Sequence, residues 1–127
     1  MNTVVVRQAV LFDLEALALL FDGYRQFYGR KSDTHAAREF LLARFNHGES
    51  VLFIAHKNEV PVGFTQLYPS FSSVSLARTF VLNDIFVSEQ ARRSGVASEL
   101  MSAAVAFAKT LGAVRISLST ATTNESA

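Results

Sequence analysis

Residues 81–97 read VLNDIFVSEQARRSGVA, and this stretch decides the predicted fold because it joins a strand, a loop and a helix. Its first part belongs to an almost continuously apolar run, residues 79–87, which predicts a buried strand interrupted only by Asn83 and Asp84. After the loop, residues 95–111 place apolar side chains three and four positions apart, which is typical of a helix with one buried face.

The loop between that strand and that helix has the composition of an anion-binding site. The first N–H groups of a helix lack acceptors within the helix, and the helix dipole adds partial positive charge there. Gly95 lets the backbone approach a ligand closely, and Ala97 keeps the first turn small. Arg92 and Arg93 add fixed charge, so the loop predicts a cradle for a diphosphate. The alternative is an ordinary tight turn with solvated arginines. Neither a Walker A ending nor a three-glycine dinucleotide fingerprint is present.

Two helices are predicted in the first part of the chain. Asp13 is expected to cap the first helix with its side chain, and Gly29 is expected to end it. Asp33 or Thr34 is expected to cap the second helix, which ends at Gly48. Both segments carry apolar residues at helical spacing, so each is expected to bury one face.

Short runs rich in β-branched and aromatic residues predict the strands. The Ser-rich segment 69–75 is expected to be a loop. The resulting order, βααβββαβ, describes a single α/β domain over residues 1–127, with a mixed, mostly antiparallel sheet and one right-handed βαβ crossover near its end. The predicted strands are residues 4–6, 51–55, 60–68, 79–87 and 115–120.

Composition narrows the class of protein. The chain has 127 residues, 50% of them apolar, which is enough for the core of one domain. A formal net charge of +1 gives no electrostatic footprint for a nucleic acid, and the absence of cysteine excludes disulfides, a thiolate nucleophile and zinc sites with Cys ligands. His35, His47 and His56 are scattered, so no metal site is expected. The N-terminus does not resemble a signal peptide and no apolar run can span a bilayer, so a soluble cytoplasmic protein without a membrane partner is expected.

The pattern Arg92-x-x-Gly95-x-Ala97, placed directly after the predicted strand, resembles the signature of the GNAT acetyltransferases. In that superfamily the signature reads Gln or Arg, two variable residues, Gly, one variable residue, and Gly or Ala. The resemblance covers the whole chain, because the predicted element order matches the GNAT acyl-CoA N-acyltransferase fold. Residues 82–101 also look like the corresponding run of polyamine and other small-amine acetyltransferases. The resemblance therefore implies an enzyme that transfers acetyl from acetyl-CoA to a primary amine.

The resemblance also implies how acetyl-CoA would be held. The backbone at the end of the fourth strand would pair with the pantetheine arm as an added strand would, where the fourth and fifth strands separate. Loop and first-turn N–H groups would hold the pyrophosphate, with a serine hydroxyl and an arginine side chain beside them. The residues implied are Ile85, Phe86 and Val87 for the pantetheine arm, Arg92, Arg93, Ser94, Gly95, Val96, Ala97 and Ser98 for the phosphates, and Asn124 after the fifth strand.

Two features depart from the family pattern. Arg93 stands where many members have glycine, although its N–H can still serve. The chain stops at Ala127, whereas the family continues into a fourth helix, which carries the tyrosine that commonly protonates the leaving thiolate, and into further strands. The resemblance thus implies a truncated fold that lacks the final helix and strands. Two alternatives follow: an acyl-CoA-binding module without turnover, or an enzyme completed by a neighbouring chain, where the exposed edge of the fifth strand favours a homodimer.

Three residues are candidates for contact with the acceptor amine. The amine must lose a proton before it attacks a thioester, because free alkylamines have a pKa near ~10. Asp84 lies beside the expected thioester site, and is interpreted as a base, as a ligand for a cationic acceptor, or as a structural carboxylate. Tyr24 and Tyr28 lie where the family places the acceptor pocket; alternatively they are ordinary packing residues. Asn83 is expected on the opposite face from Asp84 unless a bulge intervenes.

Overall fold

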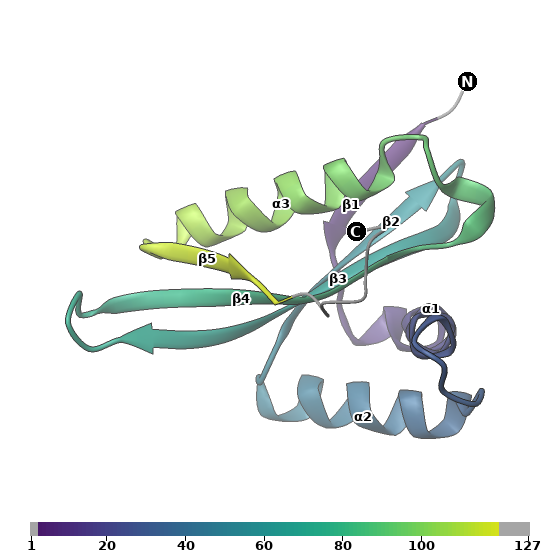
Figure 1. The fold of residues 1–127 in the computed structure, drawn as a ribbon, viewed down its shortest axis with the longest axis horizontal. Coiled ribbons are helices and arrows are strands. Elements are labelled where there is room, and N and C mark those ends of the chain that lie inside the picture. Colours follow the sequence, from purple (N-terminus) through teal and green to yellow (C-terminus); the bar gives the residue numbers. More distant parts are fainter. Residues whose placement is uncertain (1–2, 120–127) are drawn as a thin grey trace.

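The computed structural model describes residues 3–119 and shows a five-stranded sheet with helices on both faces (Figure 1). The strands are β1 Val4–Gln8, β2 Val51–Lys57, β3 Val60–Ser72, β4 Ala77–Val87 and β5 Arg115–Leu118; the helices are α1 Leu14–Phe27, α2 Thr34–His47 and α3 Val96–Thr110, with short 3-10 helices η1 Leu11–Asp13 and η2 Glu89–Ala91. The strand order is β1-β2-β3-β4-β5, and all neighbours are antiparallel except β4 and β5. The predicted order βααβββαβ and the mixed, mostly antiparallel sheet are therefore confirmed.

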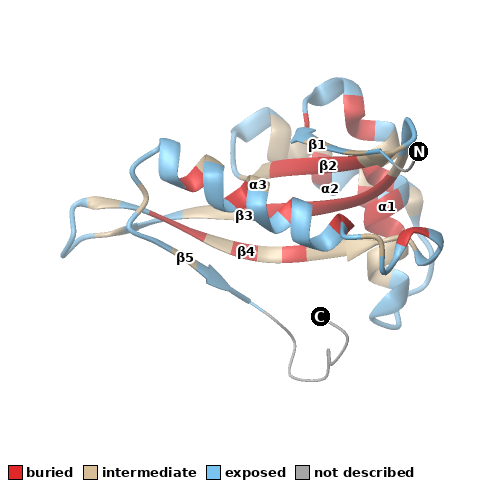
Figure 2. Cartoon of the chain, turned by 90° about the horizontal axis from the view of Figure 1, so that it is seen from above, coloured by how far each residue is buried: buried red, intermediate tan, exposed pale blue. Residues whose placement is uncertain are grey.

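Each face of the sheet has its own apolar core. On the face covered by α3, Phe53 and Leu67 of the sheet pack with Leu100 of the helix. On the opposite face, Phe64 packs with Leu41 and other residues of α1 and α2. Figure 2 shows buried residues concentrated in β2, β3 and part of β4, whereas β5 is mostly exposed. Strand β4 is therefore an inner strand whose side chains point alternately into two different cores.

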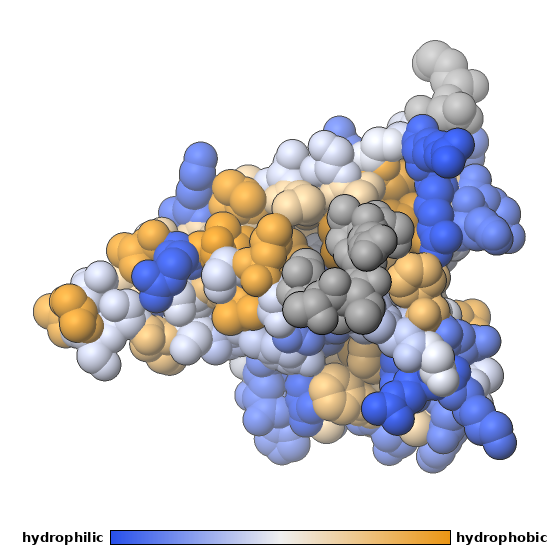
Figure 3. All heavy atoms as spheres, in the orientation of Figure 1, coloured by the Kyte–Doolittle hydropathy of each residue, from blue (hydrophilic) through white to orange (hydrophobic). Residues whose placement is uncertain are grey.

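Strand β3 is longer than the sequence indicates. The segment predicted as a loop, residues 69–75, continues the strand as far as Ser72, so that prediction is wrong for residues 69–72 and is confirmed only for the turn that follows. Pro69 pairs with Phe80 of β4, but β2 pairs with β3 no further than Leu67. Pro69 therefore lies in a part of β3 that has one strand partner, where proline is tolerated because its missing N–H can face solvent. The outer ends of β3 and β4 project as a hairpin with exposed apolar side chains (Figures 1 and 3).

The first two helices begin as predicted, but only one of them has the predicted side-chain cap. Asp33 caps α2 by accepting a hydrogen bond from the N–H of Ala36 at 3.0 Å, and Gly48 ends that helix in the left-handed region with a φ of 61°. Asp13 directly precedes α1, yet its carboxylate makes no capping hydrogen bond to that helix. The prediction that Asp13 caps α1 with its side chain is therefore wrong.

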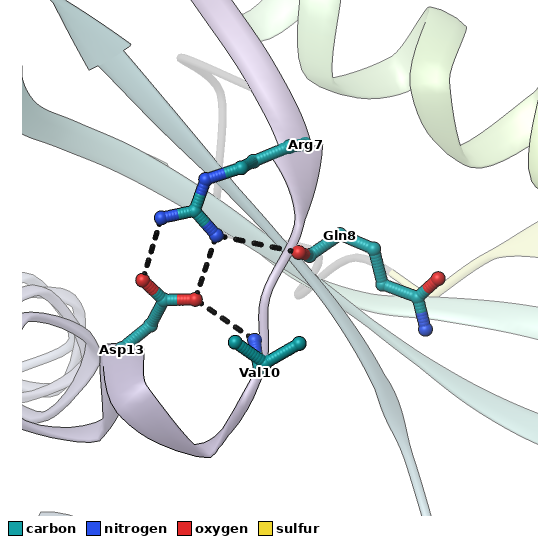
Figure 4. A network of polar contacts seen from close by, with 4 residues as sticks. All are labelled: Arg7, Gln8, Val10 and Asp13. Carbon is teal, nitrogen blue, oxygen red and sulfur yellow. Dashed lines mark hydrogen bonds and ion pairs between the residues drawn. The ribbon is translucent and has the colours of Figure 1, made fainter.

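Asp13 instead ties the start of α1 to the end of β1 (Figure 4). Arg7 donates from Nη1 to Asp13 Oδ2 at 2.8 Å and from Nη2 to Asp13 Oδ1 at 2.7 Å, and the N–H of Val10 donates to Oδ2 at 2.8 Å. The hydrogen bond from Arg7 is the main reason that the pKa of Asp13 is lowered, since burial alone would raise it. A bidentate ion pair fixes the relative orientation of its two side chains and also adds stability. This pair therefore holds the start of α1 in one direction relative to β1.

We expect the Arg7→Met variant to be less stable by about 1–2 kcal/mol at neutral pH, because Asp13 stays buried and charged but loses its strongest donor. Because its pKa is lowered in the folded state, Asp13 contributes to the free energy of unfolding above its ordinary pKa of about 3.9. That contribution is lost as the pH falls through the lowered value. The stability difference between wild type and variant should therefore be full above about pH 5 and shrink in acid. Urea unfolding at a series of pH values measures it, and a difference independent of pH contradicts this role for Arg7.

Candidate active site

Strand β4 contains a bulge where its two polar residues lie. Gln66 of β3 is opposite Asp84, whereas the next residue of β3, Leu67, is opposite Leu82, so Asn83 is the additional residue. The side-chain amide of Asn83 donates to Asp84 Oδ1 at 3.1 Å. Regular pairing would have put these two side chains on opposite faces, but the bulge brings them together. Asn83 is a polar group satisfied at a bulge.

Beyond the bulge, the side chains at the end of β4 point alternately to the two faces of the sheet. Phe86 packs with the core under α1 and α2, whereas Ile85 and Val87 pack with the core under α3. Because side chains alternate along a strand, Asp84 lies on the same face as Phe86. The carboxylate therefore faces α1 and α2.

Asp84 is a buried carboxylate held by neutral hydrogen-bond donors. The residue is 5% exposed, and its Oδ2 accepts from Nε2 of Gln66 at 2.8 Å. Burial is the main cause of the raised pKa of Tyr24, and that pKa is raised further by a hydrogen bond to Asp84 and by its charge. Within residues 3–119, no Lys, Arg or His forms an ion pair with Asp84. A buried carboxylate without a cationic partner is costly, and such groups are candidates for functional sites.

Tyr68 and Gln66 extend the surroundings of Asp84. The pKa of Tyr68 is raised by burial first and then by the negative charge of Asp84, while the positive charge of Arg44 opposes that rise. Oε1 of Gln66 is buried and receives no hydrogen bond from the part of the chain that the structure describes. The sequence did not indicate this role for Gln66. The sequence does contain one indication, because Gln66 and Tyr68 stand two positions apart in a largely apolar strand. That spacing places both side chains on the same face of the sheet.

The end of β4 has a free edge in the described residues. Strand β5 pairs with β4 only between Thr79 and Leu82, and the last backbone contact runs from the N–H of Ser119 to the carbonyl of Leu82 at 3.0 Å. From Asn83 onward, no described residue of β5 pairs with β4. Among the described residues, the backbone of the segment predicted to bind an extended ligand therefore has no strand partner on that side, and the carbonyl of Val87 accepts from the side chain of Arg92 in the loop.

The loop after β4 turns twice through the left-handed region before α3 begins. Arg93 has a φ of 66° and Gly95 has a φ of 81°. A non-glycine residue is strained in that region, so the backbone at Arg93 has the conformation that glycine adopts most easily. Among the described residues, the N–H groups of residues 93–98 have no protein acceptor, and the first helical bond runs from Glu99 to the carbonyl of Gly95 at 3.0 Å. These N–H groups are the donors that an anion would require.

A groove of ≈ 520 Å³ lies between α1, the end of β4, this loop and α3. It brings together most of the residues that the sequence indicated, from both the predicted cofactor site and the predicted acceptor site, but Asp84 and Gly95 do not line it. Ser94 instead donates its hydroxyl to the carbonyl of Ala91, and Ser98 lines a separate hollow along α3. Asn124 lies outside the described residues. The predicted residues that line the groove are Tyr24, Tyr28, Ile85, Phe86, Val87, Arg92, Arg93, Val96 and Ala97; those that the sequence did not indicate are Phe27, Ala91 and Met101.

Arg92 forms part of the groove wall. Its Nε donates to the carbonyl of Val87 at 2.9 Å, which ties the loop back to the end of β4. Its guanidinium group lies 5.7 Å from the ring centroids of both Phe27 and Phe86. In this position Arg92 brings positive charge to the groove without filling it.

No three His, Cys, Asp or Glu side chains within residues 3–119 come together in a way that could hold a metal ion. No helix in the same range is long and apolar enough to cross a bilayer.

An open strand edge that leads to unpaired N–H groups at a helix N-terminus suits an extended ligand that ends in phosphates, as the resemblance to the GNAT fold implies for acetyl-CoA. The chain belongs to the acetyltransferase (GNAT) family, whose sequence model matches residues 16–127. The family uses acetyl-CoA as the acyl donor, so the chain is an acetyl-CoA-dependent acyltransferase.

Similar proteins support this assignment. The chain is 48% identical over 115 residues to the "Uncharacterized N-acetyltransferase YhfO" of Bacillus subtilis. The aligned region covers 91% of this chain and 77% of that protein. It is 39% identical over 101 residues to a "Probable acetyltransferase" of Haemophilus influenzae, covering 79% and 69% of the two chains. A crystal structure of a probable acetyltransferase superposes with a TM-score of 0.89 at 46% identity, over 95% of this chain and 82% of the other.

Proposed function

We propose that this chain acetylates the primary amine of a small, polyamine-like molecule. The observation that carries the proposal is Asp84, a buried carboxylate that no cation neutralises among the described residues. A protonated amine would supply the missing positive charge at the place where β4 opens. The acceptor would be recognised by charge and by aromatic surface.

The acetyl-CoA site follows from the groove and the loop. The pantetheine arm would pair with the backbone of residues 85–87, along the edge that β5 leaves free. The pyrophosphate would accept hydrogen bonds from the N–H groups of residues 93–97, whose donors have no protein acceptor among the described residues. Arg92 and Ser98 would lie at the margin of the phosphate site, and Asn124 remains a proposed cofactor contact.

The acceptor site is argued from the free capacity of Asp84. A carboxylate offers about four lone-pair sites, and three are used by Gln66, Asn83 and Tyr24. One site therefore remains for an ammonium N–H. The rings of Tyr24 and Tyr28 line the adjoining groove and provide aromatic surface on which a cation is attracted.

The reaction needs no covalent enzyme intermediate. The ammonium group of the acceptor gives up one proton to Asp84, and its neutral nitrogen then attacks the thioester carbonyl. The carbon–sulfur bond breaks as the carbon–nitrogen bond forms, and the second proton that the nitrogen loses is taken up by the departing sulfur. CoA leaves as a thiolate, which is a good leaving group because thiols have a pKa near ~8.5. Asp84 contributes by attracting the cation and by accepting its proton.

The test is release of the CoA thiol from acetyl-CoA in the presence of a panel of acceptors. We expect turnover with primary diamines and polyamines, weaker turnover with monoamines of the same length, and none with the corresponding alcohols, which carry no charge for Asp84 to attract. Equal turnover with amino acids that carry a carboxylate beside the amine, and none with diamines, contradicts the proposed acceptor class. It would leave the family assignment intact.

A further inference from the structure

Helix α1 and the turn before it carry apolar side chains on the side that faces away from the sheet. Phe12 of η1 is 92% exposed and Leu19 of α1 is 66% exposed. Ala16, Gly23 and Phe27 continue this row at spacings of three and four residues, so all five share one side of the helix. The other side of α1 is already buried against the sheet and α2. A helix that is apolar on both sides is typical of one that is covered on both sides.

A hollow of ≈ 690 Å³ lies against this outward side of α1. The second half of the helix forms one wall, and Pro61 of β3 with the loop after β4 forms the other. The ring of Phe86 closes the hollow beside Gly23, because a Cβ at position 23 would lie 3.3 Å from that ring. The hollow is therefore bounded mainly by apolar groups, and one of the residues that line it, Gly23, has no side chain.

We propose that this surface binds a second copy of the chain, with the two α1 helices packed antiparallel about a two-fold axis. An axis that sets Leu19 of one copy opposite Ala16 of the other also sets Phe12 opposite Gly23. Each large side chain then faces a small residue, and Phe12 of each copy enters the hollow of the other. The same surface carries both the projection and the recess, which is the condition for an isologous interface.

The area of this surface is of the size that a stable dimer needs. The exposed apolar side chains of this row are Phe12, Leu19 and Phe27, which are roughly half to nine-tenths exposed and offer on the order of 400 Å² of apolar area per copy. A standard interface buries about 800 Å² per partner, which includes a polar rim around such a core.

The interface would also affect the groove of the candidate active site, because the hollow and the groove share part of their lining. Phe27, Phe86 and Arg92 line both the hollow and the groove. A phenylalanine seated in the hollow would restrict the motion of these three side chains. The dimer itself does not depend on the proposed reaction, so its test needs no substrate.

Sedimentation velocity over a wide range of protein concentration tests the dimer. We expect wild type to be dimeric, and Phe12→Asp and Leu19→Asp each to weaken dimerisation on the order of a thousandfold, because every substitution enters a symmetric interface twice. Leu118→Asp, on the exposed edge strand β5, is the control and should leave the dimer intact. A wild type that stays monomeric overturns the proposal. So does a dimer that survives Phe12→Asp and dissociates with Leu118→Asp, which would place the interface at β5.

Cross-linking tests the register of the two helices. The chain has no cysteine, so a Leu19→Cys variant carries a single thiol that a short bis-maleimide can join only to a second copy. We expect efficient formation of a covalent dimer with Leu19→Cys, and little with Val105→Cys on the exposed side of α3. Equal cross-linking of both variants, or of neither, contradicts an interface centred on α1.

Discussion

The Gly95→Val variant is expected to bind CoA at least about a hundredfold more weakly than wild type while remaining folded. Gly95 has a φ of 81°, and a Cβ placed there meets no atom within 4 Å, so the substitution causes backbone strain and no clash. Left-handed backbone costs an ordinary residue roughly 1–2 kcal/mol, and a β-branched residue more. The loop can relieve this strain by moving Gly95 out of that region, which turns the N–H groups of residues 93–97 away from their common target. Loss of two charge-assisted hydrogen bonds costs about 3–6 kcal/mol, which corresponds to the expected loss of affinity.

The matched control is Gly112→Val, at the other end of α3. Gly112 has a φ of 68°, and a Cβ there also meets nothing within 4 Å, so the strain is similar but the groove is distant. Both variants should lose similar stability in thermal unfolding, and only Gly95→Val should lose CoA affinity in titration calorimetry. Pantetheine, which lacks the pyrophosphate, should bind Gly95→Val and wild type alike. If Gly95→Val retains full CoA affinity, the proposed phosphate site is wrong.

The fold was predictable because its signals are local. The apolar run of β4 and the helical spacing in α3 specify their elements without reference to the rest of the chain, and Gly95 marks the turn between them. Pro69 was misread because proline and serine favour loops, and only the pairing of β3 with β2 and β4 shows that one side of this segment is free. Sequence position alone does not reveal where a neighbouring strand ends.

The site was predictable in part, for the same physical reason. Backbone N–H groups at a helix start can be inferred from the sequence, whereas side-chain partners from distant elements cannot. The bulge at Asn83 depends on the register with β3, and it decides that Asn83 and Asp84 lie together. Asp13 was assigned to the helix that follows it, but the stronger donor was Arg7 on the preceding strand. In each case a specific long-range or cross-element contact outweighed the local preference.

The Asp84→Asn variant is expected to lose about two to three orders of magnitude in kcat/KM for the amine, with CoA affinity unchanged within about twofold. The substitution keeps the shape of the side chain but removes the charge that attracts an ammonium group and the oxygen that takes its proton. An asparagine at this position can accept from only one side, so one of the donors from Gln66, Asn83 or Tyr24 loses its acceptor. That should also lower stability by about 1–3 kcal/mol.

Asp13→Asn separates the loss of stability from the loss of function. Asp13 is also 5% exposed and also holds several donors, but these are Arg7 and the N–H of Val10, which do not line the groove. Steady-state kinetics on both variants, at a temperature where each is fully folded, should show normal turnover for Asp13→Asn and greatly reduced turnover for Asp84→Asn. If Asp84→Asn retains the turnover of wild type, the carboxylate only supports the bulge of β4, and another group must accept the proton of the amine. If kcat is kept and KM alone rises, Asp84 binds the cation without accepting its proton, because a proton acceptor acts in the transition state and its loss lowers kcat.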